Sequence, residues 1–323
     1  MDNLTHTLVG AALAEAGLKK RTALGAVTLM IGANFPDVDA IAVPLGVGLE
    51  FRRGATHGFL ALAILPFVLA GIMWLWDSQV RRRRDPTLPA ADFRQLALLS
   101  AISISTHPTL DFMNTYGMRW LMPFADQWFY ADGMFIVDPW FLGVLVAGVV
   151  VSRRRKHVDP ARIALATASS YVILMLCVTT MGRSQVYQLV GPRKFMVQPT
   201  PLKPWHRGIV VDEPGAYRFG SYTAFGEARL SDVTIAKGGG DPAVGLARET
   251  VAAQRFLSWA RFPFYRVVRD RDGTLVRIAD ARYMGDDARG WAAIEVRIPV
   301  SPRLAVGADP IPYTLLVERV GFP

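Results

Sequence analysis

The stretch GFLALAILPFVLAGIMWLW, residues 58–76, carries no charged side chain. A helix rises about 1.5 Å per residue and the hydrocarbon core of a bilayer is about 30 Å thick, so this stretch is long enough to cross a membrane. It therefore predicts a transmembrane helix and indicates that the chain is a membrane protein.

Three other apolar runs of comparable length lie at residues 95–112, 134–152 and 161–181. The first of them is interrupted by serines and by His107 and Asp111. Ionisable groups are costly in lipid, so we expect this helix to turn its polar face toward the protein interior. These runs predict three more transmembrane helices, which makes four in all.

Two shorter apolar runs, residues 4–18 and 22–35, are separated by the basic residues 19–21. Each is short for a complete crossing, so we expect a helical hairpin or two short spans. The predicted fold is thus a mainly α-helical membrane domain, residues 1–182, with four transmembrane helices after this N-terminal pair.

The composition changes after residue 182. The chain has 323 residues, of which 51% are hydrophobic, and the apolar excess lies before that point. A proline-rich segment, 183–206, predicts a linker. Beyond it, residues 207–323 predict a small α+β domain, with a helix at 248–261 and strand-like runs at 208–211, 217–223, 264–268, 275–278, 292–298 and 313–320.

Basic residues account for a net charge of +9. Many of them form compact groups at residues 19–21, 81–84 and 153–156, beside apolar runs. That placement is typical of cytoplasmic membrane flanks, so we expect no nucleic-acid partner. The same rule predicts a multi-pass membrane protein whose C-terminal domain is extracytoplasmic.

Three histidines and three aspartates recur in short polar motifs: NLTH (3–6), NFPDVD (34–39), RGATH (53–57) and HPTLD (107–111). With the basic groups inside, every one of these motifs falls at the outer face. Imidazole and carboxylate are ligands of borderline divalent metals, and the single cysteine, Cys177, provides no thiolate set. We expect one or two ions, with zinc first, held by His6, Asp37, Asp39, His57, His107 and Asp111.

Some of these residues also have structural interpretations. His107 and Asp111 stand four apart and share a helix face, where they could equally join helices through a polar cluster. Asp37 and Asp39 lie in a predicted turn, where a carboxylate often caps a helix. Taken by itself, His6 is compatible with an ordinary N-terminal histidine.

Neighbouring residues complete the predicted site. Arg52 and Arg53 precede a helix that Thr56 can cap, and guanidinium groups bind phosphate in a bidentate manner. They are predicted to bind an anionic substrate, although Arg52 could instead contact lipid headgroups. Asp138 begins another apolar run and could either support the site or cap its helix.

The ordered motifs resemble those of the YdjM-like membrane-bound metal-dependent hydrolases over roughly residues 1–180. The resemblance implies an inner-membrane protein with a zinc-dependent hydrolase core, distantly similar to bacterial zinc-dependent phospholipase C. It also implies that the six histidines and aspartates form the metal site. Many members have a histidine directly before the Arg-Gly pair, where this chain has Phe51-Arg52.

The expected activity is metal-assisted hydrolysis, in which a metal lowers the pKa of water and a carboxylate accepts its proton. Asp37 or Asp39 is the expected base. A site at the membrane boundary favours an amphiphilic substrate, and the two arginines favour a phosphoester, so lipid or lipid-linked phosphodiesters come first. The alternative is a non-catalytic metal-binding membrane protein, such as a transporter, a sensor or a scaffold.

Overall fold

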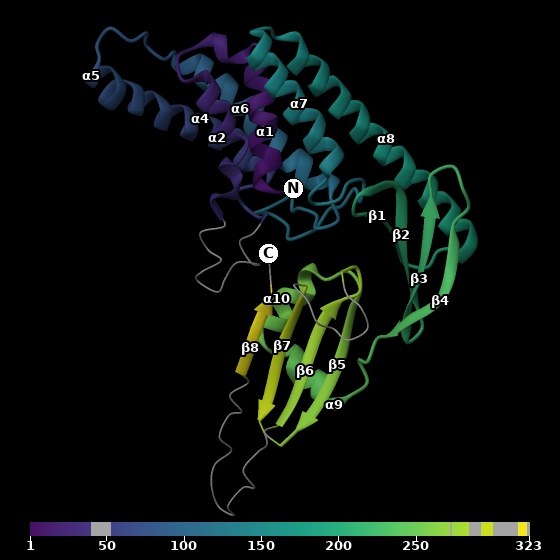
Figure 1. Ribbon diagram of the computed structural model, residues 1–323. Helices are drawn as coiled ribbons and strands as arrows, with labels where there is room; N and C mark the ends of the chain where they lie inside the picture. The colour runs from purple at the N-terminus through teal and green to yellow at the C-terminus, as the bar shows by residue number, and fades with distance from the viewer. Residues whose placement is uncertain (40–52, 272, 284–291, 300–315, 322–323) are drawn as a thin grey trace, which may run out of the picture. The chain divides into compact units, whose positions relative to one another are not determined.

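The computed structural model describes residues 1–39, 53–271, 273–283, 292–299 and 316–321 (Figure 1). Contacts divide the chain into two compact units. The first contains residues 1–183 together with 197–207 and 223–225, and the second contains the remainder. All the helices up to α7 and nearly all of α8 belong to the first unit.

Helix α1 (Asn3–Glu15) begins where the Asp2 carboxylate accepts a hydrogen bond from the Thr5 amide at 3.0 Å. Helix α2 (Gly25–Gly32) packs tightly against it, because a Cβ on Gly10 of α1 would collide with the Leu29 backbone. A Cβ on Gly32 would likewise collide with Ser103 of a third helix. The two glycines therefore let the backbones approach closely.

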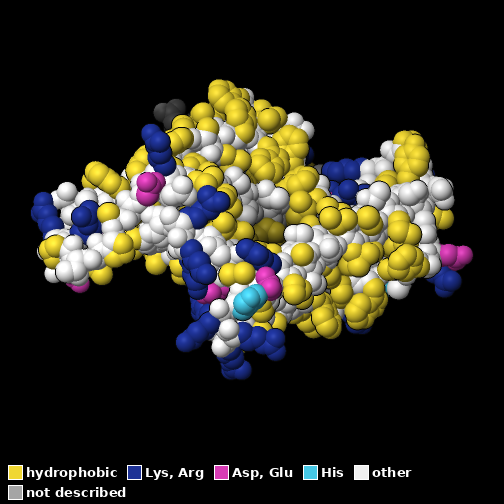
Figure 2. All heavy atoms as spheres, turned by 90° about the horizontal axis from the view of Figure 1, so that it is seen from above, with side chains coloured by type: hydrophobic (Ala, Val, Ile, Leu, Met, Phe, Trp, Pro, Cys, Tyr) yellow, Lys and Arg dark blue, Asp and Glu magenta, His cyan; other side chains and the backbone are white. Residues whose placement is uncertain are grey.

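Helix α4 (Phe59–Trp76) continues through a π-helical turn, η3 (Asp77–Arg81), into α5 (Arg82–Arg84). Its inner face packs on α6 (Phe93–Met113) through a core that includes Leu69 and Leu96. Its outer face exposes large apolar side chains such as Phe67, which is 61% exposed. Figure 2 shows apolar side chains spread widely over the face that it draws, with lysines and arginines in separate groups.

Helix α7 (Pro139–Arg155) is followed by α8 (Asp159–Val190), the longest helix described. The Asp138 carboxylate caps α7 by accepting hydrogen bonds from the amides of Trp140 and Phe141. Asp138 also accepts a hydrogen bond from the Tyr171 hydroxyl at 2.9 Å, which ties α7 to α8.

The expectation of four transmembrane helices is wrong. Among the described residues, two helices are long and apolar enough to cross a membrane, Phe59–Arg84 and Asp159–Val190. Helix α6 is polar at many positions and largely buried, so its composition is that of an interior helix. Helix α7 has 17 residues and ends in three arginines. At 13 and 8 residues, α1 and α2 extend only about 20 and 12 Å.

A short 3-10 helix, η1 (Leu18–Arg21), joins α1 to α2. At this end of α1 the Glu15 carboxylate forms an ion pair with Lys19 and accepts a hydrogen bond from Arg153 Nε at 3.0 Å. The predicted basic groups at 19–21 and 153–156 therefore lie together at one end of the helical unit.

The expectation of a small α+β domain is also wrong, because the C-terminal part is large and rich in strands. It contains two four-stranded sheets, ordered β1-β2-β3-β4 and β5-β6-β7-β8. The strands are β1 (Phe195–Thr200), β2 (Lys203–Glu213), β3 (Ala216–Thr223), β4 (Arg229–Ala236), β5 (Pro263–Asp270), β6 (Gly273–Asp280), β7 (Ala293–Pro299) and β8 (Leu316–Gly321). Successive strands β5 to β8 pair antiparallel.

Helices α9 (Pro242–Arg248) and α10 (Val251–Trp259) pack on the second sheet (Figure 1). The helix expected over 248–261 corresponds to α10, which begins later because Thr250 caps it by accepting a hydrogen bond from the Ala253 amide at 3.2 Å. Helix α9 was not predicted. Residues 183–206, predicted as a linker, contain the end of α8, all of β1 and the start of β2.

Candidate metal centre

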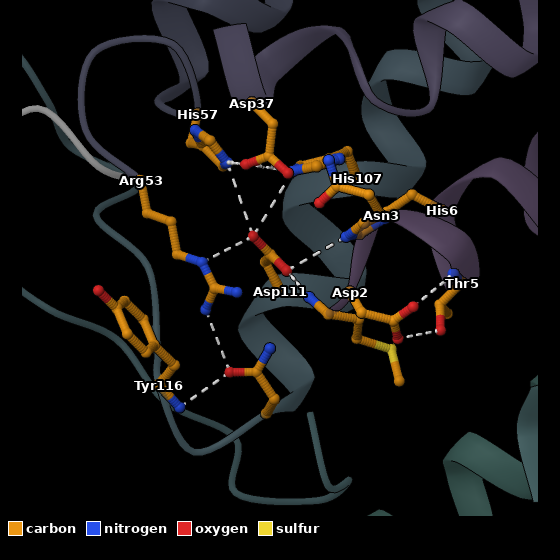
Figure 3. A network of polar contacts seen from close by, with 12 residues as sticks. Asp2, Asn3, Thr5, His6, Asp37, Arg53, His57, His107, Asp111 and Tyr116 are labelled. Atoms are coloured by element: carbon orange, nitrogen blue, oxygen red, sulfur yellow. Dashed lines mark hydrogen bonds and ion pairs between the residues drawn. The ribbon is translucent and has the colours of Figure 1, made fainter. Parts of the chain in front are cut away.

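Four separate segments bring the predicted histidines and aspartates together; Figure 3 labels all of them except Asp39. His6 comes from the first turns of α1, Asp37 and Asp39 from a 3-10 turn after α2, and His57 from the residues before α4. His107 and Asp111 lie on successive turns of α6. All three imidazoles are fully buried, and the side chain of Asp111 is 1% exposed.

The nitrogen atoms His57 Nε2 and His107 Nε2 lie 3.1 Å apart. Asp37 Oδ1 lies 3.7 Å from the first and 3.5 Å from the second, and Asp111 Oδ2 is 3.6 Å from each. Ligands bound tetrahedrally to zinc at 2.0–2.1 Å are about 3.3 Å from one another. The four atoms therefore have nearly the spacing of such a ligand set.

Hydrogen bonds on the far side of each ring determine which nitrogen carries the proton. His107 Nδ1 donates to the Ala33 carbonyl at 2.7 Å. His57 Nδ1 lies 3.0 Å from Thr56 Oγ1 and 3.3 Å from Asp39 Oδ2, while the Thr56 hydroxyl donates to the same carboxylate. Both Nδ1 atoms are thus donors, so in neutral rings both Nε2 atoms present lone pairs.

Two imidazole lone pairs that face each other 3.1 Å apart cannot form a hydrogen bond with one another. Two carboxylate oxygens beside them add negative charge rather than a proton donor. A cation between the four atoms would reconcile them, so the residues present fit a divalent metal. Among the described residues, two groups of three side chains are close enough to hold a metal ion. One consists of Asp37, His57 and His107, and the other of His6, His107 and Asp111.

His6 gives this second group an unusual feature. Its ring stacks on His107 with centroids 3.8 Å apart, and its Nε2 lies 3.4 Å from Asp111 Oδ1. Neither ring nitrogen of His6 has a hydrogen-bond partner among the described residues. The Met1 amino group also contacts Asp111 Oδ1. Asp111 therefore turns one oxygen toward each metal-binding group.

The environment favours the forms of Asp37 and His57 that bind metals. Burial alone would raise the pKa of Asp37, but its neighbours His107, His57 and Arg53 hold that pKa well below the usual range. Burial lowers the pKa of His57 to about 4, and the hydrogen bond to Asp39 opposes this only in part. A carboxylate and a neutral imidazole are the states that ligate metals.

Arg53 takes part in the centre through Asp111. Its Nε lies 2.9 Å from Asp111 Oδ2, and its Nη1 donates to Asn114 Oδ1 and to the Gly117 carbonyl. The guanidinium also lies over the Tyr116 ring, 4.4 Å from the centroid. Arg53 therefore holds Asp111 in place, a role that the sequence did not predict; its phosphate-binding role stays a prediction. Arg52 lies outside the described residues.

Asp39 and Asp138 have roles of different kinds. Asp39 Oδ2 accepts hydrogen bonds from the Arg53 amide and the Thr56 hydroxyl, so it orients His57 from outside the four converging atoms. Asp138 caps α7 and binds Tyr171, which corresponds to the helix-capping alternative. Asp39 was predicted as a ligand because it lies two residues after Asp37. That spacing does not show which of the two carboxylates faces the metal-binding atoms.

In a comparison with protein families, the sequence model of the YdjM inner membrane protein family matches residues 1–186. The chain belongs to this family. The matched residues include every member of the candidate centre. They also include the two helices long enough to span a membrane, apart from the last residues of α8. Comparisons with curated proteins and with solved structures gave no match.

Membership of the YdjM family confirms the expected resemblance and makes the chain an inner-membrane family protein. The expected similarity to zinc-dependent phospholipase C receives no support from the comparisons. Family membership alone does not identify the metal, the side of the membrane on which the centre lies, or a catalytic activity.

Proposed function

We propose that this protein is a membrane-bound, metal-dependent hydrolase that cleaves phosphoesters of lipids or lipid-linked molecules. One observation carries the proposal: the Nε2 lone pairs of His57 and His107 and the carboxylates of Asp37 and Asp111 converge at nearly tetrahedral spacing. A bound divalent ion, with zinc the first candidate, would supply Lewis-acid activation of water and of a phosphoryl oxygen.

The chain's own residues have distinct tasks in this proposal. Asp37 Oδ1 is one of the four converging atoms, and the second oxygen of this carboxylate would accept the proton of the attacking water. Asp37 is assigned this task because its side chain, 9% exposed, is the more accessible of the two carboxylates in its turn. Asp39 keeps the Nδ1 proton of His57 directed away from the centre. Arg53 holds Asp111 through its Nε.

The substrate class follows from the position of the centre in the helical unit. The centre lies at the beginning of α1 and before α4, whereas the basic groups lie at the end of α1 and at the end of α7. With the basic end in the cytoplasm, the centre faces the outer boundary of the inner membrane. A hydrolytic site there meets amphiphilic molecules with their phosphate groups at the same depth.

Metal analysis and a hydrolysis screen on the full-length protein test the proposal together. The substrates are a phosphatidylglycerol vesicle and the chain-free diester bis(p-nitrophenyl) phosphate. His57→Ala should lose metal and activity by more than the about 10–100-fold that removal of a supporting residue costs. The matched control is His157→Ala, since the side chain of His157 is 63% exposed.

The two functional classes give different results in this experiment. Hydrolysis by the wild type and by His157→Ala, with loss in His57→Ala, supports the hydrolase. A wild type that retains metal and cleaves no phosphoester supports the non-catalytic metal-binding alternative. Full metal retention in His57→Ala would contradict the site itself.

A further inference from the structure

A groove of about 570 Å³ lies among four helices of the first unit. Side chains from α1, α6, α7 and α8 form its walls, among them Val9, Leu13, Leu110, Leu145 and Val172. Its volume falls within the about 300–1,000 Å³ that small-ligand sites occupy. The lining is predominantly apolar, so a hydrocarbon group fits it better than a headgroup or an ion.

The polar residues of the groove do not change this character. The hydroxyl of Thr106 donates to the Ser103 carbonyl at 2.7 Å, and that of Thr109 donates to the Ser105 carbonyl at 2.8 Å. Both hydroxyls are therefore paired within α6. The two threonines then contribute chiefly their methyl groups to the wall.

None of the candidate ligands lines the groove, but two of its lining residues are close to them along the helices. On α1, Val9 lies three residues after His6 and hence on the same face of the helix. On α6, Leu110 directly precedes Asp111. A molecule in the groove would therefore have one end within reach of the residues that converge on the centre.

One wall of the groove belongs to a helix that could contact lipid. Its α8 wall belongs to one of the two helices long enough to span a membrane. Ile173, at the rim, is 62% exposed. A hydrocarbon chain could thus enter sideways from the bilayer without crossing water.

We propose that this groove holds one hydrocarbon chain of the lipid whose phosphoester group occupies the metal centre. The phosphoester headgroup in this inference rests on the proposed function. The hydrocarbon chain is inferred from the groove alone. A transmembrane helix from another protein is a poor occupant, because a helix about 10 Å across would fill this volume in fewer than two turns. A chain one methylene wide can follow the groove along its length.

Two adjacent serines on α8 provide a matched pair of variants. Ser169 and Ser170 are both exposed, but only Ser169 is among the residues that line the groove. Ser169→Phe should place an aromatic ring in the groove, whereas Ser170→Phe places the same ring outside it. Because Ser169 is exposed, we expect the larger side chain to leave the helix packing intact.

The measurement is photo-cross-linking of the full-length protein in phosphatidylglycerol vesicles that contain a phospholipid with a diazirine in one acyl chain. Labelled peptides are identified by mass spectrometry. In the wild type we expect labelling of Leu110 and Met113, which lie in the groove. Ser169→Phe should reduce this labelling by at least about fivefold, because the ring occupies volume that the hydrocarbon chain needs; fivefold corresponds to about 1 kcal/mol of binding free energy. Ser170→Phe should leave it unchanged.

Labelling of Phe67, which is exposed on α4, is the internal reference for ordinary lipid contact. Absence of label on Leu110 and Met113 in the wild type, or equal labelling in both serine variants, overturns the groove. Groove labelling does not depend on turnover. If the wild type is labelled in the groove but cleaves no phosphoester, the proposed function fails while the lipid-chain site stands. If the wild type cleaves phosphoesters but is not labelled in the groove, the lipid-chain site fails while the proposed function stands.

Discussion

Helix α1 has a buried ionisable side chain with charged or polar partners at each end, and the two clusters differ in how their charges are satisfied. At the C-terminal end, Glu15 faces Lys19 and Arg153, so a carboxylate meets two cations. At the N-terminal end, His6 joins a group of imidazoles and carboxylates in which neutral ring lone pairs face one another.

The comparison shows that burial of charge does not by itself indicate a functional site. The Glu15 cluster is complete as it stands, since every strong acceptor oxygen there has a cationic donor. In the His6 cluster Asp111 also meets two cations, Arg53 and the Met1 amino group. The Nε2 lone pairs of His57 and His107, however, face each other and Asp37, and a metal cation would complete this set of acceptors. Imbalance between donors and acceptors is the property that distinguishes the candidate centre.

The largest expected effect comes from His107, because it belongs to both metal-binding groups. His107→Ala should remove all bound metal, whereas His6→Ala should leave the ion held by Asp37 and His57. Elemental analysis of both purified variants measures the difference. If His107→Ala keeps as much metal as His6→Ala, the two groups do not share a ligand.

A smaller effect is expected from Asp39, which orients His57 without facing the four converging atoms. Asp39→Ala should weaken zinc binding by about 10–100-fold, as loss of such supporting carboxylates does elsewhere. Competition with a chromophoric chelator gives the affinity. The control is Asp126→Ala, which removes an exposed carboxylate paired with Arg119; equal weakening in the two variants would remove Asp39 from the centre.

The smallest effect is expected at the other end of α1. Glu15→Gln should lower the free energy of unfolding by no more than about 1 kcal/mol, because both of its cationic partners are substantially exposed. The metal content should be unchanged. Thermal unfolding in detergent, together with elemental analysis, checks both points. Loss of metal in Glu15→Gln would show that the two ends of α1 are not independent.

The sequence predicted the apolar helices best. The runs at 58–76 and 161–181 correspond to α4 and to part of α8. A long run without charged residues is a strong signal, because such a helix is more stable in lipid than in water. The run at 95–112 was wrongly predicted to be a span. Its length matches α6, but its serines, His107 and Asp111 belong to an interior helix.

The six candidate ligands were predicted as one group, and the structure brings all of them together in space. The alternation of basic groups and polar motifs was enough for this. The role of Arg53 was not predictable, because its partners Asn114 and Gly117 are more than 60 residues away in the sequence. Strand β4 was missed because most of its residues are exposed and show no alternation.

X-ray absorption spectroscopy of the purified protein tests the central claim most directly. We predict at least one zinc ion per chain, with nitrogen and oxygen ligands alone at about 2.0–2.1 Å. The single cysteine, Cys177, is exposed, so adventitious zinc bound there would show a sulfur ligand at about 2.3 Å. A sulfur ligand, or protein that takes up no metal when zinc is supplied, would contradict the candidate centre.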